Sequence, residues 1–205
     1  MPTLISIIIR TKNEEKWLPF CLESVFGQRT KSNIEVIIVD NNSSDHTVSI
    51  AKRFPVSRII NIDTFLPGKA INDGIRSSRG EYIVCLSSHC VPKENNWLEI
   101  LLKNFETSNI AGVYGRQLPL QHTSSVDKRD LLMVFGLDRK VQKKDYFFHN
   151  ANSMIPRSIW EKFPFDEDVT NIEDRVWGKE VIKAGYNIIY DPDAEVYHHH
   201  GLHQN

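Results

Sequence analysis

Three clusters of polar side chains in the first half of the sequence could form a ligand site. They are Thr11–Glu14, Asp40–Asp45 and Ser87–His89, and each comes at the end of a run rich in Ile, Val or Leu. In an open parallel sheet, ligands bind outside the carboxyl ends of the strands, where loops lead into helix N-termini. The chain has neither a G-x-G-x-x-G pattern nor a Walker loop. Neither dinucleotide binding nor P-loop phosphate binding is therefore indicated.

The elements that must position these clusters alternate between strands and helices. The run Leu4–Ile9 is typical of a strand buried on both faces, and Asn13 is expected to cap the helix that follows it. Further strands are predicted at 35–39, 58–62 and 82–86, and further helices around 48–54, at 69–78 and at 97–105. This alternation predicts a parallel sheet with covering helices.

The second half of the chain is less regular. We expect a strand at 113–117, a helix at 173–184 and short strands at 187–190 and 195–199. A polar stretch at about 119–146 is predicted to be a flexible loop, in which 131–135 could form a short helix, packed or exposed. The length of the chain favours a single domain over residues 1–205, with halves at 1–110 and 111–205.

Composition limits the classes of function. The chain has 205 residues, 25 basic and 26 acidic, so its summed charge offers no general attraction to nucleic acid. Three cysteines, at positions 21, 85 and 90, argue against a disulfide framework and for a reducing compartment. The N-terminal run lacks a basic signal region, and no apolar segment is long enough to span a bilayer. We expect a cytoplasmic protein, with membrane association, if any, peripheral and at the inner face.

Five segments, in order along nearly the whole chain, resemble the family 2 glycosyltransferases. They are Ser6–Glu14, Val36–Asp45, Gly68–Gly80 with Asn72 and Gly74 inside it, Ile172–Trp177 and Val196–His198. The resemblance implies an α/β, GT-A-like single domain, with a Rossmann-like, mostly parallel central sheet flanked by helices and a smaller mixed C-terminal sheet portion. It also implies inverting transfer of a sugar from a nucleotide-sugar donor to a glycan or lipid-linked acceptor, of the bacterial surface-glycan type.

The same resemblance implies roles for individual donor-binding residues. Asp40 matches the acidic residue that accepts hydrogen bonds from the donor's base, for which a carboxylate is a strong acceptor. Thr11, Asn13 and Glu14 match the loop that borders the base and ribose. The predicted donor site is completed by Asn42, Lys69, Asn72, Ser87, Ser88 and Asn152. For Asp40 and Asn13 the alternative is a local role in turns or helix caps.

Two neighbouring carboxylates match the catalytic end of the family. Asp174 matches the base that removes the proton of the acceptor hydroxyl in a single displacement, with no covalent intermediate. Glu173 is expected to hold Asp174 or to bind acceptor. The alternative is that the pair only stabilises a helix N-terminus, where negative charge is favoured.

The metal site is where the sequence departs from the family. The usual Asp-x-Asp, which binds a divalent cation on the diphosphate, is replaced by Ser87-Ser88-His89. His89 is predicted to take the second position, with His198 as a further ligand. Because imidazole is a softer ligand than carboxylate, this set favours Mn²⁺ over Mg²⁺. Without a metal, Lys69, Arg76 or Arg175 would have to neutralise the diphosphate.

Two competing hypotheses remain at this stage. A catalytically inactive nucleotide-sugar-binding or scaffolding domain of the same fold is favoured by the lost Asp-x-Asp, and disfavoured by the retained Asp174. A nucleotidyltransferase would normally show a Gly-rich basic loop near the first strand, which Thr11-Lys12-Asn13-Glu14-Glu15 is not. Oligomeric state is left open.

Overall fold

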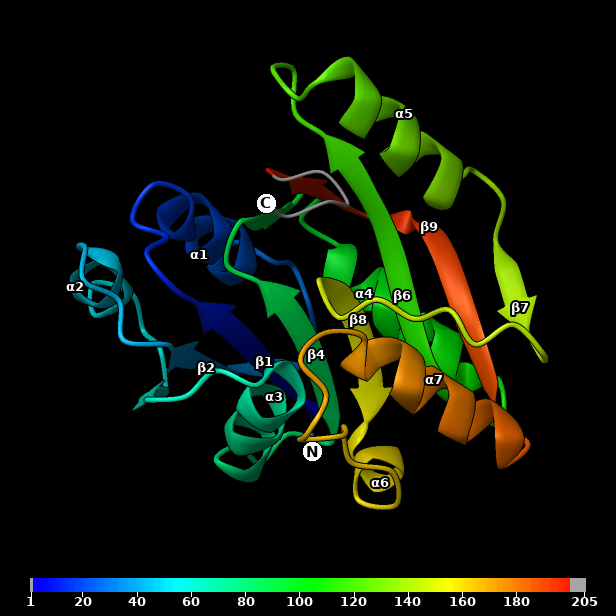
Figure 1. Cartoon of the computed structure of the whole chain (residues 1–205). Coiled ribbons are helices and arrows are strands. Elements are labelled where there is room, and N and C mark those ends of the chain that lie inside the picture. Colours follow the sequence, from blue (N-terminus) through cyan, green and yellow to red (C-terminus); the bar gives the residue numbers. More distant parts are fainter. Residues whose placement is uncertain (1, 200–205) are drawn as a thin grey trace.

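The computed structural model describes residues 2–199, which form one sheet covered by helices (Figure 1). One half of the sheet is parallel, in the order β3-β2-β1-β4. These strands are β1 (Leu4–Thr11), β2 (Asn33–Asp40), β3 (Arg58–Asn61) and β4 (Tyr82–Ser87). All four lie where the apolar runs predict them. Their carboxyl ends therefore meet at one edge of the sheet.

The other half of the sheet is mixed and continues from β4 in the order β8-β6-β9-β5. The strands are β8 (Asn152–Pro156), β6 (Ile110–Pro119), β9 (Asn187–His198), β5 (Cys90–Pro92) and β7 (Lys140–Gln142), which also pairs with β9. The two short strands predicted at 187–190 and 195–199 form one long strand. β5 was not predicted, since a strand of three residues is defined by its pairing with β9.

Two cores cover the two faces of the sheet. On one face pack α1 (Leu18–Phe26), α2 (Thr47–Ala51) and α4 (Trp97–Leu102), which continues into a 3₁₀ turn at Lys103–Glu106. On the other pack α3 (Pro67–Arg76), α5 (Ser125–Val134), α6 (Arg157–Trp160) and α7 (Glu173–Lys183). In β1, Ile7 and Ile9 enter the first core and Ile8 the second. A strand buried on both faces explains the continuous β-branched run.

Two local predictions are corrected. Asn13 does not cap α1: it has a φ of 53°, and α1 begins at Leu18, after a cap at Trp17. The segment 119–146 is not a continuous loop, because it contains α5 and β7. The short helix anticipated at 131–135 is longer and starts earlier, with Ser124 accepting a hydrogen bond from the Asp127 amide. Leu131 and Phe135 are fully buried, which anchors this helix on the sheet.

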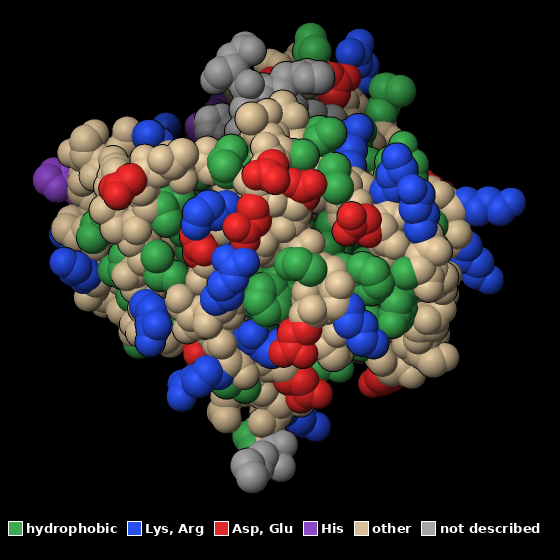
Figure 2. Space-filling model, turned by 60° about the horizontal axis from the view of Figure 1, so that its bottom comes forward, with side chains coloured by type: hydrophobic (Ala, Val, Ile, Leu, Met, Phe, Trp, Pro, Cys, Tyr) green, Lys and Arg blue, Asp and Glu red, His purple; other side chains and the backbone are tan. Residues whose placement is uncertain are grey.

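Surface charges on α3 are paired locally. Asp73 lies 2.6 Å from Lys69 Nζ and 2.9 Å from Arg76, and Arg76 also reaches Glu167 at 2.6 Å. Basic and acidic side chains are interspersed over the face shown in Figure 2. Among residues 2–199, no helix is long and apolar enough to cross a membrane.

The start of α3 is pressed against the segment that leads to α7. A Cβ at Gly68 would collide with the backbone carbonyl of Asp166. Any larger residue would push these segments apart, so glycine here allows the close approach. The contact places two chain segments nearly a hundred residues apart beside the same edge of the sheet.

Candidate functional site

The carboxyl ends of the parallel strands bring the first predicted residues together. Thr11 pairs with Asp40 across β1 and β2, and Arg10 pairs with Ser87 across β1 and β4. Ser88 and His89 form the turn after β4. The hydroxyl oxygen of Thr11 is buried and has no hydrogen-bond partner among residues 2–199. A buried polar atom of this kind is expected to meet a water or ligand atom.

Hydrogen bonds join the loops after β1 and β2. The Asn13 amide oxygen accepts from the Ser44 backbone N–H at 2.8 Å, and the Asn13 N–H donates to Ser43. The Glu14 N–H donates to the Thr47 hydroxyl at 2.7 Å. These hydrogen bonds between the two loops fix the backbone position of Glu14.

Asp40 is a turn residue in this structure. Its side chain is 1% exposed. One carboxylate oxygen accepts from the Ser43 backbone N–H at 2.9 Å, and the other accepts from the Ser43 hydroxyl at 2.6 Å. These bonds match the local role weighed as the alternative, an Asp that satisfies backbone donors at the entry to a helix. The structure thus shows the local role of Asp40, and its base-binding role stays a prediction.

Two predicted donor-binding amides are buried in the core. The Asn72 oxygen accepts from Trp160 Nε1 and the Phe165 N–H, and its nitrogen donates to the Phe165 carbonyl and to Glu167. Asn152 accepts from Trp97 Nε1 at 3.0 Å and donates to the Ala194 carbonyl at 2.8 Å. Both side chains are 0% exposed. Their hydrogen-bonding capacity is used by contacts inside the fold, and the donor-binding role expected for both stays a prediction.

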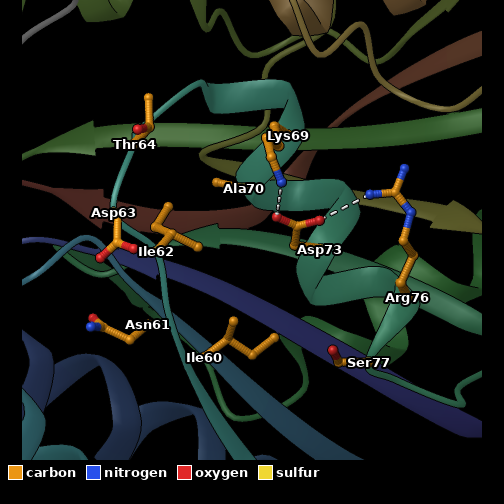
Figure 3. Close-up of a pocket in the computed structure, with 10 residues that line it drawn as sticks. All are labelled: Ile60, Asn61, Ile62, Asp63, Thr64, Lys69, Ala70, Asp73, Arg76 and Ser77. Atoms are coloured by element: carbon orange, nitrogen blue, oxygen red, sulfur yellow. Dashed lines mark hydrogen bonds and ion pairs between the residues drawn. The ribbon is translucent and has the colours of Figure 1, made fainter.

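A pocket of about 530 Å³ between β3 and α3 is lined by Lys69 and adjoined by Asn42 (Figure 3). Lys69 lines it and points toward Asp73. Asn42 bonds to two of its lining residues, accepting from Asn61 and donating to Asp63. The pocket lies to the side of the parallel half of the sheet, and its lining includes neither Asp174 nor His89.

Glu173 and Asp174 begin α7 beside the end of β1. Glu173 is 5% exposed and accepts from Arg10 at 3.2 Å and from Asn150 at 3.3 Å. Asp174 accepts from the Asn150 N–H at 3.4 Å and from the Arg175 N–H at 2.8 Å. The structure thus joins residues far apart in the sequence into one cluster. Glu173 ties the start of α7 to β1 through Arg10, and both roles expected for it, holding Asp174 or binding acceptor, stay predictions.

His149 completes this cluster. Its Nδ1 lies 3.0 Å from the Gln117 side-chain amide and accepts from the Ala151 N–H at 3.3 Å. These donors leave the imidazole proton on Nε2. Burial lowers the pKa of His149, and the charge of Asp174 opposes that shift. Burial raises the pKa of Asp174, Glu173 adds to the rise, and His149 opposes it. A carboxylate with a raised pKa is a stronger base when ionised.

A second cluster contains both predicted metal ligands. Ligand atoms of His89, Cys90 and His198 lie within 4.8 Å of one another, and the two imidazoles stack with centroids 5.0 Å apart. Glu14 lies 2.6 Å from His89 Nδ1. A carboxylate behind Nδ1 fixes the tautomer in which Nε2 can bind a metal, a common arrangement around histidine ligands. Two imidazoles suit Mn²⁺ better than Mg²⁺. Burial raises the pKa of the Cys90 thiol well above its usual value.

Sequence reasoning missed three members of the site: Arg10, Gln117 and His149. Arg10 is a charged residue at the end of a buried apolar strand, and that signal was available. Gln117 and His149 lie 32 residues apart, and their contact depends on how β6 and β8 pair. No local pattern predicts that pairing.

The chain thus forms an α/β sheet with carboxylates and imidazoles gathered at its strand ends, where open parallel sheets bind their ligands. The sequence model of glycosyl transferase family 2 matches residues 6–163. The chain belongs to this family.

Characterised relatives extend the match over most of the chain. The O-antigen chain rhamnosyltransferase WbaN of Salmonella anatum is 28% identical over 187 residues, which cover 85% of this chain and 59% of WbaN. A dolichyl N-acetyl-alpha-D-glucosaminyl phosphate 3-beta-D-2,3-diacetamido-2,3-dideoxy-beta-D-glucuronosyltransferase of Methanococcus voltae is 28% identical over 214 residues, 92% of this chain and 64% of that protein. The chain spans about three-fifths of the length of these relatives.

Solved structures share the fold at lower identity. The mannosyltransferase PcManGT of Pyrobaculum calidifontis, solved with GDP-Man and Mn²⁺, has a TM-score of 0.77 at 20% identity and covers 100% of this chain and 59% of its own. S. aureus TarS 1-349 with UDP-GlcNAc has a TM-score of 0.75 at 18% identity, over 100% of this chain and 60% of TarS. The expected GT-A-like α/β fold is confirmed.

Proposed function

We propose that the chain is the catalytic domain of an inverting glycosyltransferase, which moves a sugar from a nucleotide-sugar donor to a glycan or lipid-linked acceptor in surface-glycan synthesis. The observation that carries the proposal is the setting of Asp174. This carboxylate has a raised pKa and begins a helix braced by Arg10 and Glu173. Relatives named as rhamnosyl- and glucuronosyltransferases, and neighbours solved with GDP-Man and UDP-GlcNAc, support sugar transfer.

Asp174 acts as the general base in this proposal. It removes the proton of the acceptor hydroxyl as that oxygen attacks the anomeric carbon of the donor. Burial raises the pKa of Asp174, while His149 opposes that shift and Glu173 adds to it. Glu173 does not react in this proposal, because it is buried and held by Arg10 and Asn150, whereas Asp174 is only partly buried.

The donor lies along the strand ends in this proposal. Thr11 offers a buried hydroxyl without a protein partner among residues 2–199, and Ser87 lies beside Arg10 at the end of β4. Asn42 and Lys69 extend this polar edge toward the pocket beside α3. The extent of this edge supports binding of an elongated, polar ligand such as a nucleotide sugar.

His89 and His198 would hold a divalent cation, with Glu14 orienting His89. A cation held there would neutralise the charge that develops on the leaving diphosphate. These metal ligands support Mn²⁺ over Mg²⁺, because both are imidazole nitrogens.

Thermal unfolding with UDP, GDP, CDP, TDP and CMP, each with and without Mn²⁺, tests the proposal. We expect one nucleotide to raise the melting temperature, a larger rise with Mn²⁺, and loss of that Mn²⁺ effect in His89→Ala. His46→Ala is the matched control, because His46 is exposed at the start of α2. No shift with any nucleotide would contradict the proposal. A shift without sugar release from the matching donor would favour the catalytically inactive domain.

A further inference from the structure

Exposed apolar side chains gather on one segment of the chain. Among residues 2–199, nine large hydrophobic side chains are exposed, and six of them fall between Val126 and Tyr146. Four of these lie on α5 or just after it: Val126, Leu132, Met133 and Leu137, which are 57%, 53%, 77% and 73% exposed. Single exposed apolar residues are ordinary, but a group of this kind marks a binding surface.

Helix α5 is apolar on two opposite sides. Leu131 and, one turn later, Phe135 face the core and are fully buried. Val126 and Met133 are seven residues apart and therefore lie on the outer side, with Arg129 between them. The inner side already anchors the helix on the sheet. The outer apolar side is therefore not needed for folding of this domain.

Basic side chains follow the apolar group. Arg139, Lys140, Lys143 and Lys144 are all exposed, in and around β7, and outnumber the exposed acids Asp138 and Asp145. Figure 1 shows α5 and β7 following one another along the border of the molecule beyond β6 and β9. We call this apolar and basic region the α5–β7 surface.

We propose that the α5–β7 surface docks the enzyme on an anionic lipid bilayer. Apolar side chains enter the interfacial region while Lys and Arg attract anionic headgroups, and the two contributions together give stable peripheral binding. A second copy of the chain fits less well. A two-fold contact would bring the same basic residues of both copies close together.

The α5–β7 surface is connected to the proposed catalytic base. Phe135, directly after α5, packs edge-on against His149 with ring centroids 5.8 Å apart. The Arg175 guanidinium lies 5.3 Å above the ring of Phe147. The inner side of α5 is therefore in contact with His149, whose charge acts on Asp174. Resting on the proposed function, docking on a bilayer assigns the acceptor to a lipid-linked class.

Vesicle co-sedimentation of the 205-residue chain tests the docking without any donor. We expect binding to phosphatidylcholine vesicles that contain phosphatidylglycerol, little binding to pure phosphatidylcholine, and weakening by salt. The double variant Lys143→Ser, Lys144→Ser should lose roughly thirtyfold in affinity, since each basic residue contributes about a factor of five. The variant Leu132→Ser, Met133→Ser should also bind more weakly.

The matched control is Lys52→Ser, Arg53→Ser, an exposed basic pair at the end of α2 on the far side of the sheet. It should bind vesicles like the wild type. Equal binding to both vesicle types, equal loss in the control, or no vesicle binding would overturn the proposal. A dimer in light scattering that Met133→Ser dissociates would assign the surface to a second copy instead. Nucleotide-induced thermal shifts are measured separately, so failure of docking is distinguishable from failure of the proposed function.

Discussion

Replacing Asn72 by alanine separates a folding role from a donor-binding role. In the wild type, the Asn72 side chain bonds to both the N–H and the carbonyl of Phe165, a residue that is 1% exposed. Alanine leaves these two backbone groups buried without partners. Each such group costs about 1–3 kcal/mol, so we expect a loss of about 2–6 kcal/mol in the free energy of unfolding. Trp160 and Glu167 lose bonds as well, but both are partly exposed and can turn to water.

Differential scanning fluorimetry measures the effect directly. For a domain of this size, about 1 kcal/mol corresponds to roughly 2–4 °C, so Asn72→Ala should melt roughly 4–24 °C below the wild type. At a temperature where the variant is still folded, its nucleotide affinity should be unchanged. The matched variant Asn42→Ala, at an exposed position, should change the melting temperature little and weaken nucleotide binding. An Asn72→Ala protein with wild-type melting but lost nucleotide affinity would refute this reasoning.

Three further outcomes are expected. Replacing His149 by Gln removes the imidazole that opposes the raised pKa of Asp174, so the acidic limb of the kcat/KM profile should move to higher pH, because the base must be ionised. An unmoved limb in a pH series would contradict this effect of His149. Ile172 has a φ of 82°, which is strained for a β-branched residue. Ile172→Gly should therefore raise the free energy of unfolding by about 1 kcal/mol, measured by urea titration. A variant less stable than the wild type would show that Ile172 stores no backbone strain. Glu14→Gln should weaken Mn²⁺ binding about tenfold or more in calorimetry, because Glu14 orients His89; unchanged affinity would separate Glu14 from the cation.

The parallel half of the sheet could be predicted because its signals are local. A strand buried on both faces must be apolar along its length, and the run at Leu4–Ile9 has this property. The polar residues at the strand ends then define one edge, which the registers of Thr11 with Asp40 and of Arg10 with Ser87 bear out.

The roles of individual polar residues were harder to predict because they depend on distant partners. Asn72 bonds to the backbone of Phe165, 93 residues away, and nothing near Asn72 in the sequence indicates that contact. Asp40 illustrates a different limit: an Asp three residues before a Ser-rich helix entry suits both a ligand and a turn. The structure shows that the Ser43 N–H and hydroxyl donate to the two carboxylate oxygens of Asp40.

The segment 119–146 was difficult for a third reason. Its helix carries apolar residues on both its inner side, at Leu131, and its outer side, at Met133, so its pattern lacks the single apolar stripe of an ordinary surface helix. Strand β7 is three residues long and exists through its pairing with β9. Such elements are specified by tertiary contacts.

The rate of sugar transfer by Asp174→Asn tests the central claim most directly, with Asp168→Asn, an exposed acid before the same helix, as control. With the donor found in the thermal-shift panel, we expect kcat to fall on the order of 10²–10⁴-fold in Asp174→Asn, while donor affinity and the Asp168→Asn rate stay at wild-type values. Wild-type turnover by Asp174→Asn would contradict the account.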